Sequence, residues 1–232
     1  MNITVIIPAF NEEQSIGKVV KAIPNNLINE IVVVNNNSTD GTVVAAAEAG
    51  ATVLTETIQG YGASCLTGIN YFKNKNCDIV VFMDGDFSDY PEEINKLLDP
   101  IINENYDFVL GSRIMGNREK GSLPIQSRFG SIISGILINL FWGIKYSDLG
   151  PFRAIKFDEL IKLNMRDKWY GWTVEMQIKA AKNRLKILEV PVSYRKRIGK
   201  SKVTGTVRGT FMASVIILKT IFAEYLKEKF PR

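Results

Sequence analysis

The sequence predicts an α/β protein in which a mostly parallel central sheet is flanked by helices. Strand-like and helix-like segments alternate from residue 3 to about residue 105, as in βαβ units. Residues 79–83 are all apolar, which suits a strand that is covered on both faces. The chain has 232 residues, of which 46% are hydrophobic, so it is long enough to bury a large core.

Each expected element has a local reason. Strands are expected where apolar and β-branched residues run together, and helices where apolar residues recur every three or four positions. Pro8 ends the first strand, Gly50 ends the second helix, and Pro91 opens a later helix. The expected strands are residues 3–7, 31–34, 52–55, 79–84, 108–110 and 187–194. The expected helices are residues 16–23, 43–49, 60–72, 91–103, 129–144, 172–181 and 207–229, with a polar turn at 148–153.

The composition excludes several kinds of active site. The chain has no histidine, so a Ser-His or Cys-His nucleophile is impossible and a Cys/His zinc site is not expected. Cys65 and Cys77 are too few for a disulfide scaffold, which fits a reducing cytosol. Any general base must be a carboxylate, unless the acceptor needs none.

Charge is divided unevenly along the chain. Residues 1–149 contain 10 Lys and Arg against 17 Asp and Glu, whereas residues 150–232 contain 19 against 7. The acidic part suits a metal ion, and the basic part suits phosphates or an anionic membrane. We expect no nucleic acid partner, because no RNA- or DNA-binding motif accompanies the basic residues.

Two apolar stretches, residues 129–144 and 211–223, are interrupted by Asn139 and Lys219. Both are shorter than the roughly 20 apolar residues that a spanning helix needs, so we expect buried or interfacial helices. Core and subunit packing are the alternative explanation for them. The first apolar run is short and contains Pro8, so we expect no signal peptide.

Two carboxylates, Asp84 and Asp86, directly follow the apolar run at 79–83, with Gly85 between them. In open α/β sheets, ligands bind outside the carboxyl ends of the strands. Carboxylate oxygens there suit Mg²⁺ or Mn²⁺ together with a phosphorylated substrate. The alternative is an Asp-Gly turn with solvated acids on either side.

Seven short segments carry a family resemblance through their order and spacing. They are residues 7–13 (IPAFNEE), 38–42 (STDGT), 84–86 (DGD), 111–113 (GSR), 150–153 (GPFR), 189–192 (EVPV) and 194–202 (YRKRIGKSK). Together they resemble the family 2 glycosyltransferases, and most of all their polyprenyl-phosphate (dolichyl-phosphate) hexosyltransferase branch. The resemblance implies the GT-A fold, with a Rossmann-like sheet, as one catalytic domain over residues 1–205. It leaves residues 206–232 as an amphipathic helix packed on the domain or on the membrane surface.

The resemblance also implies where the nucleotide binds. The residues that would line the base and ribose pocket are Pro8, Ala9, Asn11 and Glu12. The family's usual pair of acids after the second strand is replaced by Asn35 and Asn36, and Asn36 is expected to contact the nucleotide. An amide both donates and accepts hydrogen bonds, whereas a carboxylate only accepts, so the choice between UDP and GDP sugars stays open. A turn and helix N-cap is the alternative explanation of residues 35–40.

By the same resemblance, Asp84 and Asp86 form a site for Mg²⁺ or Mn²⁺. Asp86 would ligate the ion directly, and Asp84 would contact the ribose or the ion's water shell. Ser88 replaces a Gln that is frequent in the lipid-phosphate branch, so Asp89 is a candidate further ligand. The cations expected to bind the phosphates are Arg113, Arg128, Arg195, Arg197 and Lys200. The basic loop at 195–202 suits a lid, or else a solvated turn.

Glu175 and Arg153 are the further catalytic candidates. Glu175 lies where related inverting transferases place the acid that activates a hydroxyl acceptor; alternatively, it is a buried helix acid that holds the basic loop. Arg153 would face the sugar or the acceptor phosphate, or pair with Asp148. The aromatic residues that would either stack on the sugar or pack in the core are Trp169, Tyr170 and Trp172.

These features predict an inverting, metal-dependent glycosyltransferase that moves a hexose from a UDP or GDP sugar to polyprenyl phosphate during cell-envelope glycan synthesis. We expect peripheral attachment to the inner face of the cytoplasmic membrane and allow for a homo-oligomer. One alternative keeps the fold but transfers to a soluble or saccharide hydroxyl, with Glu175 as base. Another is a non-catalytic module that binds a nucleotide sugar or an anionic lipid.

Overall fold

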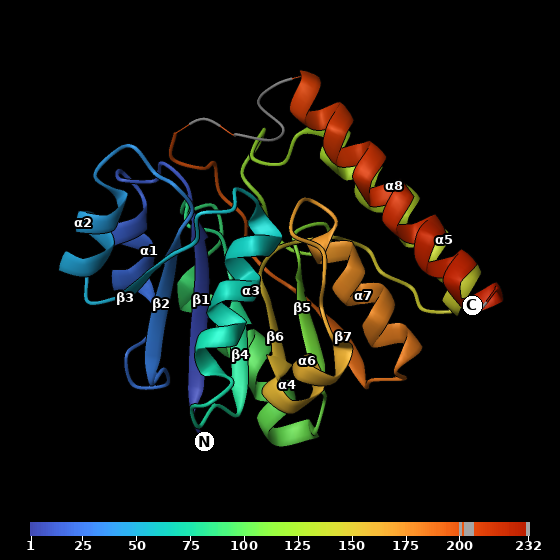
Figure 1. Cartoon of the computed structure of the whole chain (residues 1–232), viewed down its shortest axis with the longest axis horizontal. Helices are drawn as coiled ribbons and strands as arrows, with labels where there is room; N and C mark the ends of the chain where they lie inside the picture. The colour runs from blue at the N-terminus through green and yellow to red at the C-terminus, as the bar shows by residue number, and fades with distance from the viewer. Residues whose placement is uncertain (200, 202–206, 231–232) are drawn as a thin grey trace.

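The computed structural model describes residues 1–199, 201 and 207–230, and is built on a seven-stranded sheet with helices on both faces (Figure 1). The strand order is β3-β2-β1-β4-β6-β5-β7. The strands are β1 (Ile3–Ala9), β2 (Glu30–Asn35), β3 (Thr52–Thr55), β4 (Ile79–Phe82), β5 (Phe108–Ser112), β6 (Arg153–Lys156) and β7 (Ile187–Pro191). The predicted α/β class is confirmed.

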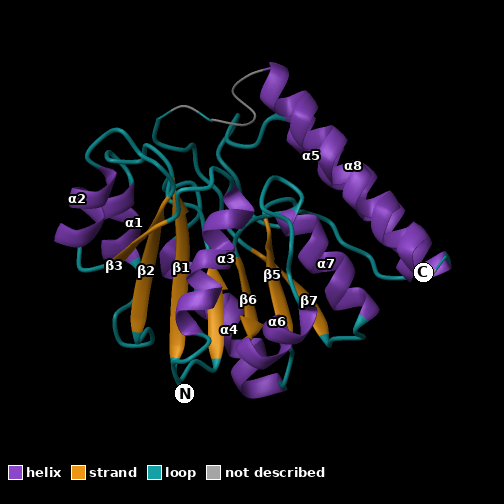
Figure 2. Ribbon diagram, viewed as in Figure 1, coloured by secondary structure: helices purple, strands orange, loops and turns teal. Residues whose placement is uncertain are grey.

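Helices cover both faces of the sheet (Figure 2). One face packs against α3 (Tyr61–Phe72), α5 (Ile125–Trp142), α6 (Phe157–Leu163), α7 (Trp172–Lys182) and α8 (Val207–Lys229). The other packs against α1 (Ile16–Ala22), α2 (Thr42–Glu48) and α4 (Asn95–Glu104), the last preceded by a 3₁₀ turn, η1 (Pro91–Glu93).

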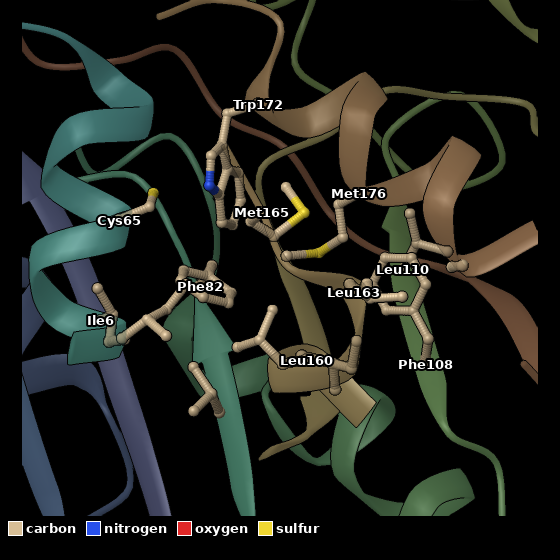
Figure 3. Packing of buried hydrophobic residues seen from close by; sticks show 14 of the residues in the cluster. Ile6, Cys65, Phe82, Phe108, Leu110, Leu160, Leu163, Met165, Trp172 and Met176 are labelled. Carbon is tan, nitrogen blue, oxygen red and sulfur yellow. The ribbon is translucent and has the colours of Figure 1, made fainter. Parts of the chain in front are cut away.

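The apolar run of β4 is buried on both sides, as its composition predicts. Val80 and Phe82 point into one core, and Ile79 and Val81 point into the other. In the first core, Trp172 packs edge-on against Phe82, with ring centroids 4.7 Å apart (Figure 3). Burial on both faces therefore fixes the position of β4 and of the turn that follows it.

The strand β6 and the helix α6 are not among the elements expected from the sequence. Residues 153–156 begin and end with a charged side chain, so they have no apolar run to mark a strand. They become a strand because both neighbours pair with them in antiparallel register, with Ala154 opposite Val81 on β4 and Val109 on β5. Long-range pairing decides this element, not local propensity.

Every strand except β6 runs in the same direction, so six carboxyl ends meet at one edge of the sheet. This edge lies at the top of Figure 1, opposite to the N-terminus. The segments at residues 8–13, 35–42, 84–89 and 111–113 all begin in the last residues of a strand or just after it, at this edge. The candidate site is therefore expected there.

The helices α5 and α8 lie side by side on one flank of the molecule (Figure 1). Near their carboxyl ends the Phe141 ring stacks on Tyr225, with centroids 4.1 Å apart, and Trp142 Nε1 donates a 2.9 Å hydrogen bond to Glu228. α5 begins at Ile125, four residues before the expected start, and α8 also packs on α7. Among the described helices, none combines the length and apolar character that crossing a bilayer requires. The boundary expected at residue 205 lies outside the described residues.

Candidate active site

Three carboxylates are gathered in the turn that follows β4. Asp86 and Asp89 are 3% and 2% exposed. Ser88 donates hydrogen bonds to Asp86 Oδ1 from both its backbone nitrogen and its hydroxyl, at 2.9 and 2.5 Å. The Asp84 backbone nitrogen donates to Asp89 Oδ2 at 3.4 Å. The turn therefore holds all three side chains near one another.

This crowding changes the acid–base chemistry of the turn. Burial and the negative charge of Asp86 together raise the pKa of Asp84 and of Asp89, the latter to about 7. The Arg113 guanidinium opposes the rise in both. A cation bound among these three acids would stabilise the turn, because it would offset their mutual repulsion.

The same turn fits a divalent ion that is shared with a substrate. In the described part of the chain, no group of three or more Asp, Glu or Cys side chains is arranged to hold a metal unaided. Mg²⁺ commonly takes one or two protein carboxylates and completes its shell with water and substrate phosphates. Asp84 and Asp86 supply that number. Asp89 Oδ1 is buried without a hydrogen-bond partner among the described residues, so it has a lone pair to offer.

Arg197 contacts this turn from the basic loop. Its Nη1 lies 2.9 Å from Asp86 Oδ2 and its Nη2 lies 3.0 Å from Glu12 Oε1. We call these two ion pairs the Arg197 bridge. The backbone nitrogen of Ile198 also donates to the Asp86 carbonyl at 2.9 Å. The loop is thus fastened over the carboxylates, and Glu12 joins them.

A cavity of about 430 Å³, here called the Asn36 cavity, opens beside the turn. It brings together residues from the ends of β1, β2 and β4, the start of α3 and the loop before α7. Its lining residues are Pro8, Ala9, Phe10, Glu12, Asn36, Gln59, Gly60, Tyr61, Ser64, Asp84, Gly85, Asp86, Trp169, Tyr170 and Arg197. Five of the residues that the sequence assigned to the nucleotide, Pro8, Ala9, Glu12, Asn36 and Asp84, therefore meet here.

Asn36 lines this cavity, but its amide is used within the protein. Nδ2 donates to the carbonyls of Glu56 and Ile58 at 3.0 and 2.8 Å, and Oδ1 accepts from the Gly60 nitrogen at 2.7 Å. These bonds hold residues 56–60 as one wall of the cavity. Asn36 therefore builds this wall as well as lining the cavity, and its expected contact with the nucleotide stays a prediction.

The first turn of α3 packs closely on the loop before α7. The nitrogens of Gly62 and Ala63 donate to the carbonyls of Trp169 and Lys168 at 3.3 and 3.0 Å, which satisfies donors that the helix start leaves free. A Cβ on Gly62 would lie 2.1 Å from the Asp167 carbonyl oxygen, so the contact requires glycine. This contact sets Trp169 and Tyr170 at the cavity. Trp172 instead lies in the core.

Glu175 lies beneath that same loop. Its carboxylate accepts hydrogen bonds from the nitrogens of Arg166 and Asp167, at 2.8 to 3.1 Å, and pairs with Lys179 at 2.7 Å. The side chain is 5% exposed and is not part of the wall of the Asn36 cavity. In this structure Glu175 fastens residues 166–167, a different loop from the basic loop considered in the sequence analysis.

A second cavity of about 360 Å³, the Arg113 cavity, also borders the carboxylates. It shares Asp84, Asp86 and Arg197 with the Asn36 cavity. Its other lining residues come from the end of β5, the start of α5 with the segment before it, and the basic loop with Tyr194. They are Arg113, Gly121, Ser122, Leu123, Pro124, Ser127, Tyr194, Lys196 and Ser201. The second cavity is therefore cationic along one side and reaches the first turn of α5.

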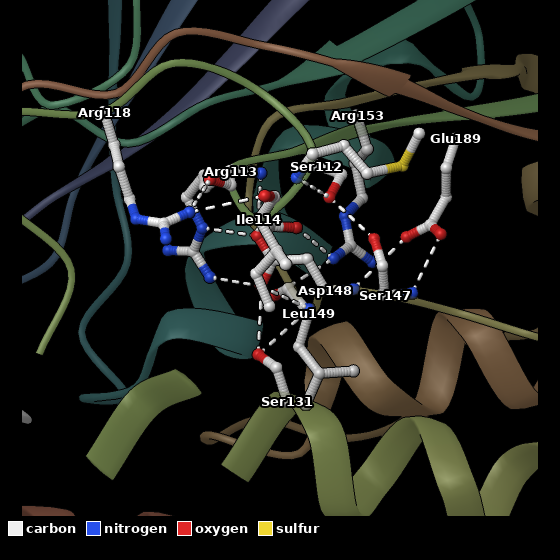
Figure 4. A network of polar contacts seen from close by, with 12 residues as sticks. Ser112, Arg113, Ile114, Arg118, Ser131, Ser147, Asp148, Leu149, Arg153 and Glu189 are labelled. Carbon is white, nitrogen blue, oxygen red and sulfur yellow. Dashed lines mark hydrogen bonds and ion pairs between the residues drawn. The ribbon is translucent and has the colours of Figure 1, made fainter. Parts of the chain in front are cut away.

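Arg113 is held in this cavity by Asp148 (Figure 4). Its Nε and Nη2 donate to the two Asp148 oxygens at 2.7 and 2.8 Å. Asp148 also accepts from Ser131 Oγ on α5 at 2.9 Å, and Glu189 accepts from the nitrogen of Ser147 at 2.8 Å. The GSR and EVPV segments thus belong to one polar network that orients Arg113 through Asp148.

Arg153 lies beneath the site and not in it. It is fully buried, and its guanidinium donates to the carbonyl oxygens of Leu149, Gly150 and Thr173. Burial lowers the pKa of Arg153. The ion pair with Asp148 that the sequence analysis considered for it is made by Arg113 instead.

The remaining candidates are placed at different points. Asn11 links β1 to the next loop, since its Oδ1 accepts from the Thr39 nitrogen at 2.8 Å. Arg195 clamps the carboxylate turn by donating to the carbonyls of Phe87 and Asp89 at 2.7 and 3.0 Å. Arg128 is exposed on the first turn of α5, and Lys200 lies outside the described residues.

Some residues that line the two cavities were not predicted from the sequence. They are Gln59, Tyr61 and Ser64 around the start of α3, in the Asn36 cavity, and Ser122 and Ser127 before and within α5, in the Arg113 cavity. The signal for α3 was available, because residues 60–62 open a helix after a parallel strand, where ligands commonly bind. For α5 no local signal marks the serines.

Comparison with known proteins gives the family. A model described as glycosyl transferase family 2 matches residues 4–163. An uncharacterised glycosyltransferase of Mycobacterium tuberculosis is 32% identical over 222 residues, covering 94% of this chain and 97% of the relative. The undecaprenyl-phosphate mannosyltransferase of Micrococcus luteus is 28% identical over 230 residues, covering 93% of each chain.

A solved structure supports the same assignment at the level of the fold. Glucosyl-3-phosphoglycerate synthase from M. tuberculosis, crystallised with Mn²⁺, UDP-glucose and phosphoglyceric acid, superposes with a TM-score of 0.77 at 21% identity, covering 97% of this chain and 79% of that chain. The expected GT-A fold is confirmed. On this evidence the chain belongs to glycosyl transferase family 2 and is a transferase, not a non-catalytic binding module.

Proposed function

We propose that this transferase moves a hexose from a UDP or GDP sugar to polyprenyl phosphate, with inversion at the anomeric carbon. The observation that carries the proposal is the pair of cavities that share Asp84 and Asp86. One suits a nucleotide sugar. The other is cationic and opens at the start of α5, a helix with an exposed apolar face, which suits a phosphate that carries a lipid tail.

The donor would occupy the Asn36 cavity. Pro8, Ala9 and residues 56–60 would enclose the base and ribose, and Trp169 and Tyr170 would lie against the sugar. Asp84 and Asp86 would hold Mg²⁺ or Mn²⁺, which supplies Lewis-acid stabilisation of the departing diphosphate. Support for this metal and this kind of donor comes from the mycobacterial synthase, which was crystallised with Mn²⁺ and UDP-glucose.

The acceptor phosphate would occupy the Arg113 cavity. Arg113 and Lys196 would bind its oxygens. Arg128 directly follows Ser127, which lines this cavity, on the first turn of α5. A phosphate monoester is already ionised at neutral pH, so its oxygen attacks the anomeric carbon as the bond to the diphosphate breaks, and no base is needed. This agrees with a chain that lacks histidine and with a Glu175 that is occupied by a loop. The name of the Micrococcus relative supports the same acceptor class.

Such an acceptor requires access to a membrane. On α5, Phe129, Ile136 and Leu140 are 61%, 62% and 71% exposed, and on α8 Phe211, Phe222 and Leu226 are 66%, 46% and 52% exposed. These side chains recur at helical spacing, so each helix presents an apolar stripe to solvent. We propose that the stripes lie in the interface of the inner face of the cytoplasmic membrane, as a peripheral attachment.

The proposal is tested first by its ligands and then by its product. The melting temperature is measured with UDP, GDP and their hexose derivatives, with and without Mn²⁺; one nucleotide should raise it most, and more with the metal. Transfer of labelled sugar from that donor to a short polyprenyl phosphate should then be lost in Asp86→Ala. If neither the wild type nor Asp86→Ala transfers sugar from any of the donors, the proposal is contradicted.

A soluble hydroxyl acceptor is the second candidate, because the mycobacterial synthase was crystallised with phosphoglyceric acid. In that case Glu175 would have to act as a base. Glu175→Gln separates the two: for a phosphate acceptor we expect a loss of about tenfold or less, mainly in KM for the donor, since only the loop at 166–170 loosens. Glu159→Gln, a helix acid paired with Lys162, is the matched control. A fall in kcat of several orders of magnitude would favour the hydroxyl acceptor.

A further inference from the structure

We propose that the Arg197 side chain is a resident substitute for the metal ion. In the metal-free protein its guanidinium occupies the cation position on Asp86, and binding of the ion and the nucleotide transfers it to the diphosphate. This inference rests on the proposed use of a divalent ion and a nucleoside diphosphate. It adds an exchange between two cations at one carboxylate.

The first support is the geometry of the Arg197 bridge. Arg197 joins Asp86 to Glu12 through contacts of 2.9 and 3.0 Å, and the two carboxylate side chains are only 5% and 8% exposed. Paired, nearly buried acids need a counter-charge, and in this structure the guanidinium supplies it. Arg197 itself is 28% exposed at its side chain, so it has room to leave.

The second support is that Asp86 cannot serve both cations at once. Its Oδ1 is already used by the nitrogen and hydroxyl of Ser88, and its Oδ2 is the atom that Arg197 contacts. Mg²⁺ binds carboxylate oxygens at about 2.0–2.1 Å, so an ion on Oδ2 would face the guanidinium at close range with like charge. The ion and the Arg197 bridge therefore exclude each other.

The third support is the place to which Arg197 can move. Its side chain forms part of the wall of both cavities, so a rotation takes it from Asp86 toward either one. Its backbone is fastened, since Ile198 donates to the Asp86 carbonyl and Arg195 to the Ser88 carbonyl, at 2.9 and 3.0 Å. The side chain alone has to move, and a diphosphate in the Asn36 cavity would offer it paired oxygens in place of Asp86 and Glu12.

This exchange has a thermodynamic signature. A metal ion binding alone must break the Arg197 bridge without compensation, whereas a diphosphate provides the freed guanidinium with a new partner. Each ligand therefore favours the state that the other binds, and their affinities are coupled. Removing Arg197 should strengthen metal binding in the absence of nucleotide and weaken nucleotide binding in the presence of metal.

The test measures Mn²⁺ binding by electron paramagnetic resonance of the free ion, and nucleotide binding by calorimetry. Arg197→Ala should bind Mn²⁺ alone about tenfold more tightly than the wild type, and the Mn²⁺–UDP or Mn²⁺–GDP pair about tenfold more weakly. Arg197→Lys, which keeps the charge but cannot bridge two carboxylates with a fork, should lie between them. Lys120→Gln is the matched control: it removes one charge from an exposed side chain before α5 and should shift Mn²⁺ affinity by less than about twofold.

If Arg197 only fastened the turn, its removal would not strengthen Mn²⁺ binding while weakening nucleotide binding. Equal or weaker Mn²⁺ binding by Arg197→Ala, with Mn²⁺ still binding to the wild type, overturns the exchange and leaves the metal site intact. Failure of all four proteins to bind Mn²⁺, with or without nucleotide, overturns both the exchange and the proposed metal. If thermal unfolding shows that the alanine variant is not folded, the lysine variant decides by the same criterion.

Discussion

Asp148 shows how one buried carboxylate can orient a binding residue. It accepts hydrogen bonds from the backbone and side chain of Arg113, from Ser131 on α5 and from the nitrogen of Leu149 (Figure 4). It therefore connects β5, α5 and the turn before β6. Its influence on Arg113 extends to the cavity in which we place the acceptor phosphate.

Replacing Asp148 by Asn should lower the free energy of unfolding by about 3–5 kcal/mol at neutral pH, because Arg113 is left buried without its counter-charge. Asp107→Asn, which affects the half-exposed pair with Lys156, is the matched control and should cost about 0–1 kcal/mol. Urea unfolding of the three proteins measures both values. Equal losses in the two variants would show that the network contributes no more than a surface pair.

The pH dependence of this effect has a definite sign. Burial alone would raise the pKa of Asp148, but the charge and hydrogen bonds of Arg113 hold it below its ordinary value. A depressed folded-state pKa stabilises the protein above the unfolded-state pKa of about 3.9, and this stabilisation is lost as the pH falls through the folded-state value. The stability difference between the wild type and Asp148→Asn should therefore narrow below about pH 4.

Asn36 gives a second prediction at the scale of one residue. Asn36→Asp removes the two donors to the carbonyls of Glu56 and Ile58, so we expect a loss of about 1–3 kcal/mol in stability and weaker nucleotide binding. Asn37→Asp is the control, since its exposed amide makes a single bond to Thr57 that water can replace. A stable Asn36→Asp variant that binds nucleotide more tightly would show that this side chain reads the base.

At the scale of the element, glycine is required at residue 62, near the start of α3, but not at residue 130 of α5. Gly62→Ala places a Cβ against the Asp167 carbonyl and should cost about 1–3 kcal/mol, with a higher KM for the donor as the Trp169 loop shifts. Gly130→Ala, within α5 and with nothing within 4 Å of its Cβ, should instead stabilise the helix by about 0.5–1 kcal/mol. Thermal unfolding of the pair measures the difference; two changes of the same sign would contradict the packing argument.

At the scale of the molecule, the two helices that carry the exposed apolar side chains, α5 and α8, lie on one flank (Figure 1). Residues at the start of α5 also line the Arg113 cavity. Ile136→Glu with Leu140→Glu should reduce sedimentation with anionic lipid vesicles by at least about tenfold, because two exposed apolar side chains that would insert into the lipid become charged. Ile102→Glu, 42% exposed on α4 across the sheet, is the control and should have little effect.

Release of the protein from vesicles tests whether its attachment through this surface is peripheral. High salt or alkali should release the protein from vesicles, as expected for interfacial helices on anionic lipid. Retention in the pellet after a carbonate wash would contradict this. If the wild type is a dimer in solution and the Ile136→Glu, Leu140→Glu variant is a monomer, the stripes pack against a second copy of the chain instead.

The sequence by itself determined the α/β class, every strand of the described sheet except β6, the burial of β4 on both faces and the place of the carboxylates, because each follows from a pattern within a few residues. The alternation of strands and helices and the run at 79–83 are such patterns, and Asp84 and Asp86 come directly after them. The motif resemblance named the family correctly.

Only the tertiary structure decided what the individual side chains do. β6 exists because two distant strands pair with it, Arg153 is enclosed by the core, and Asn36 and Glu175 are occupied by loops that fold back on them. Arg197 meets Glu12 across 185 positions of sequence. Such partners are chosen by packing and burial over the whole chain, so a local pattern can name a candidate residue but cannot tell whether its polar groups remain available to a ligand.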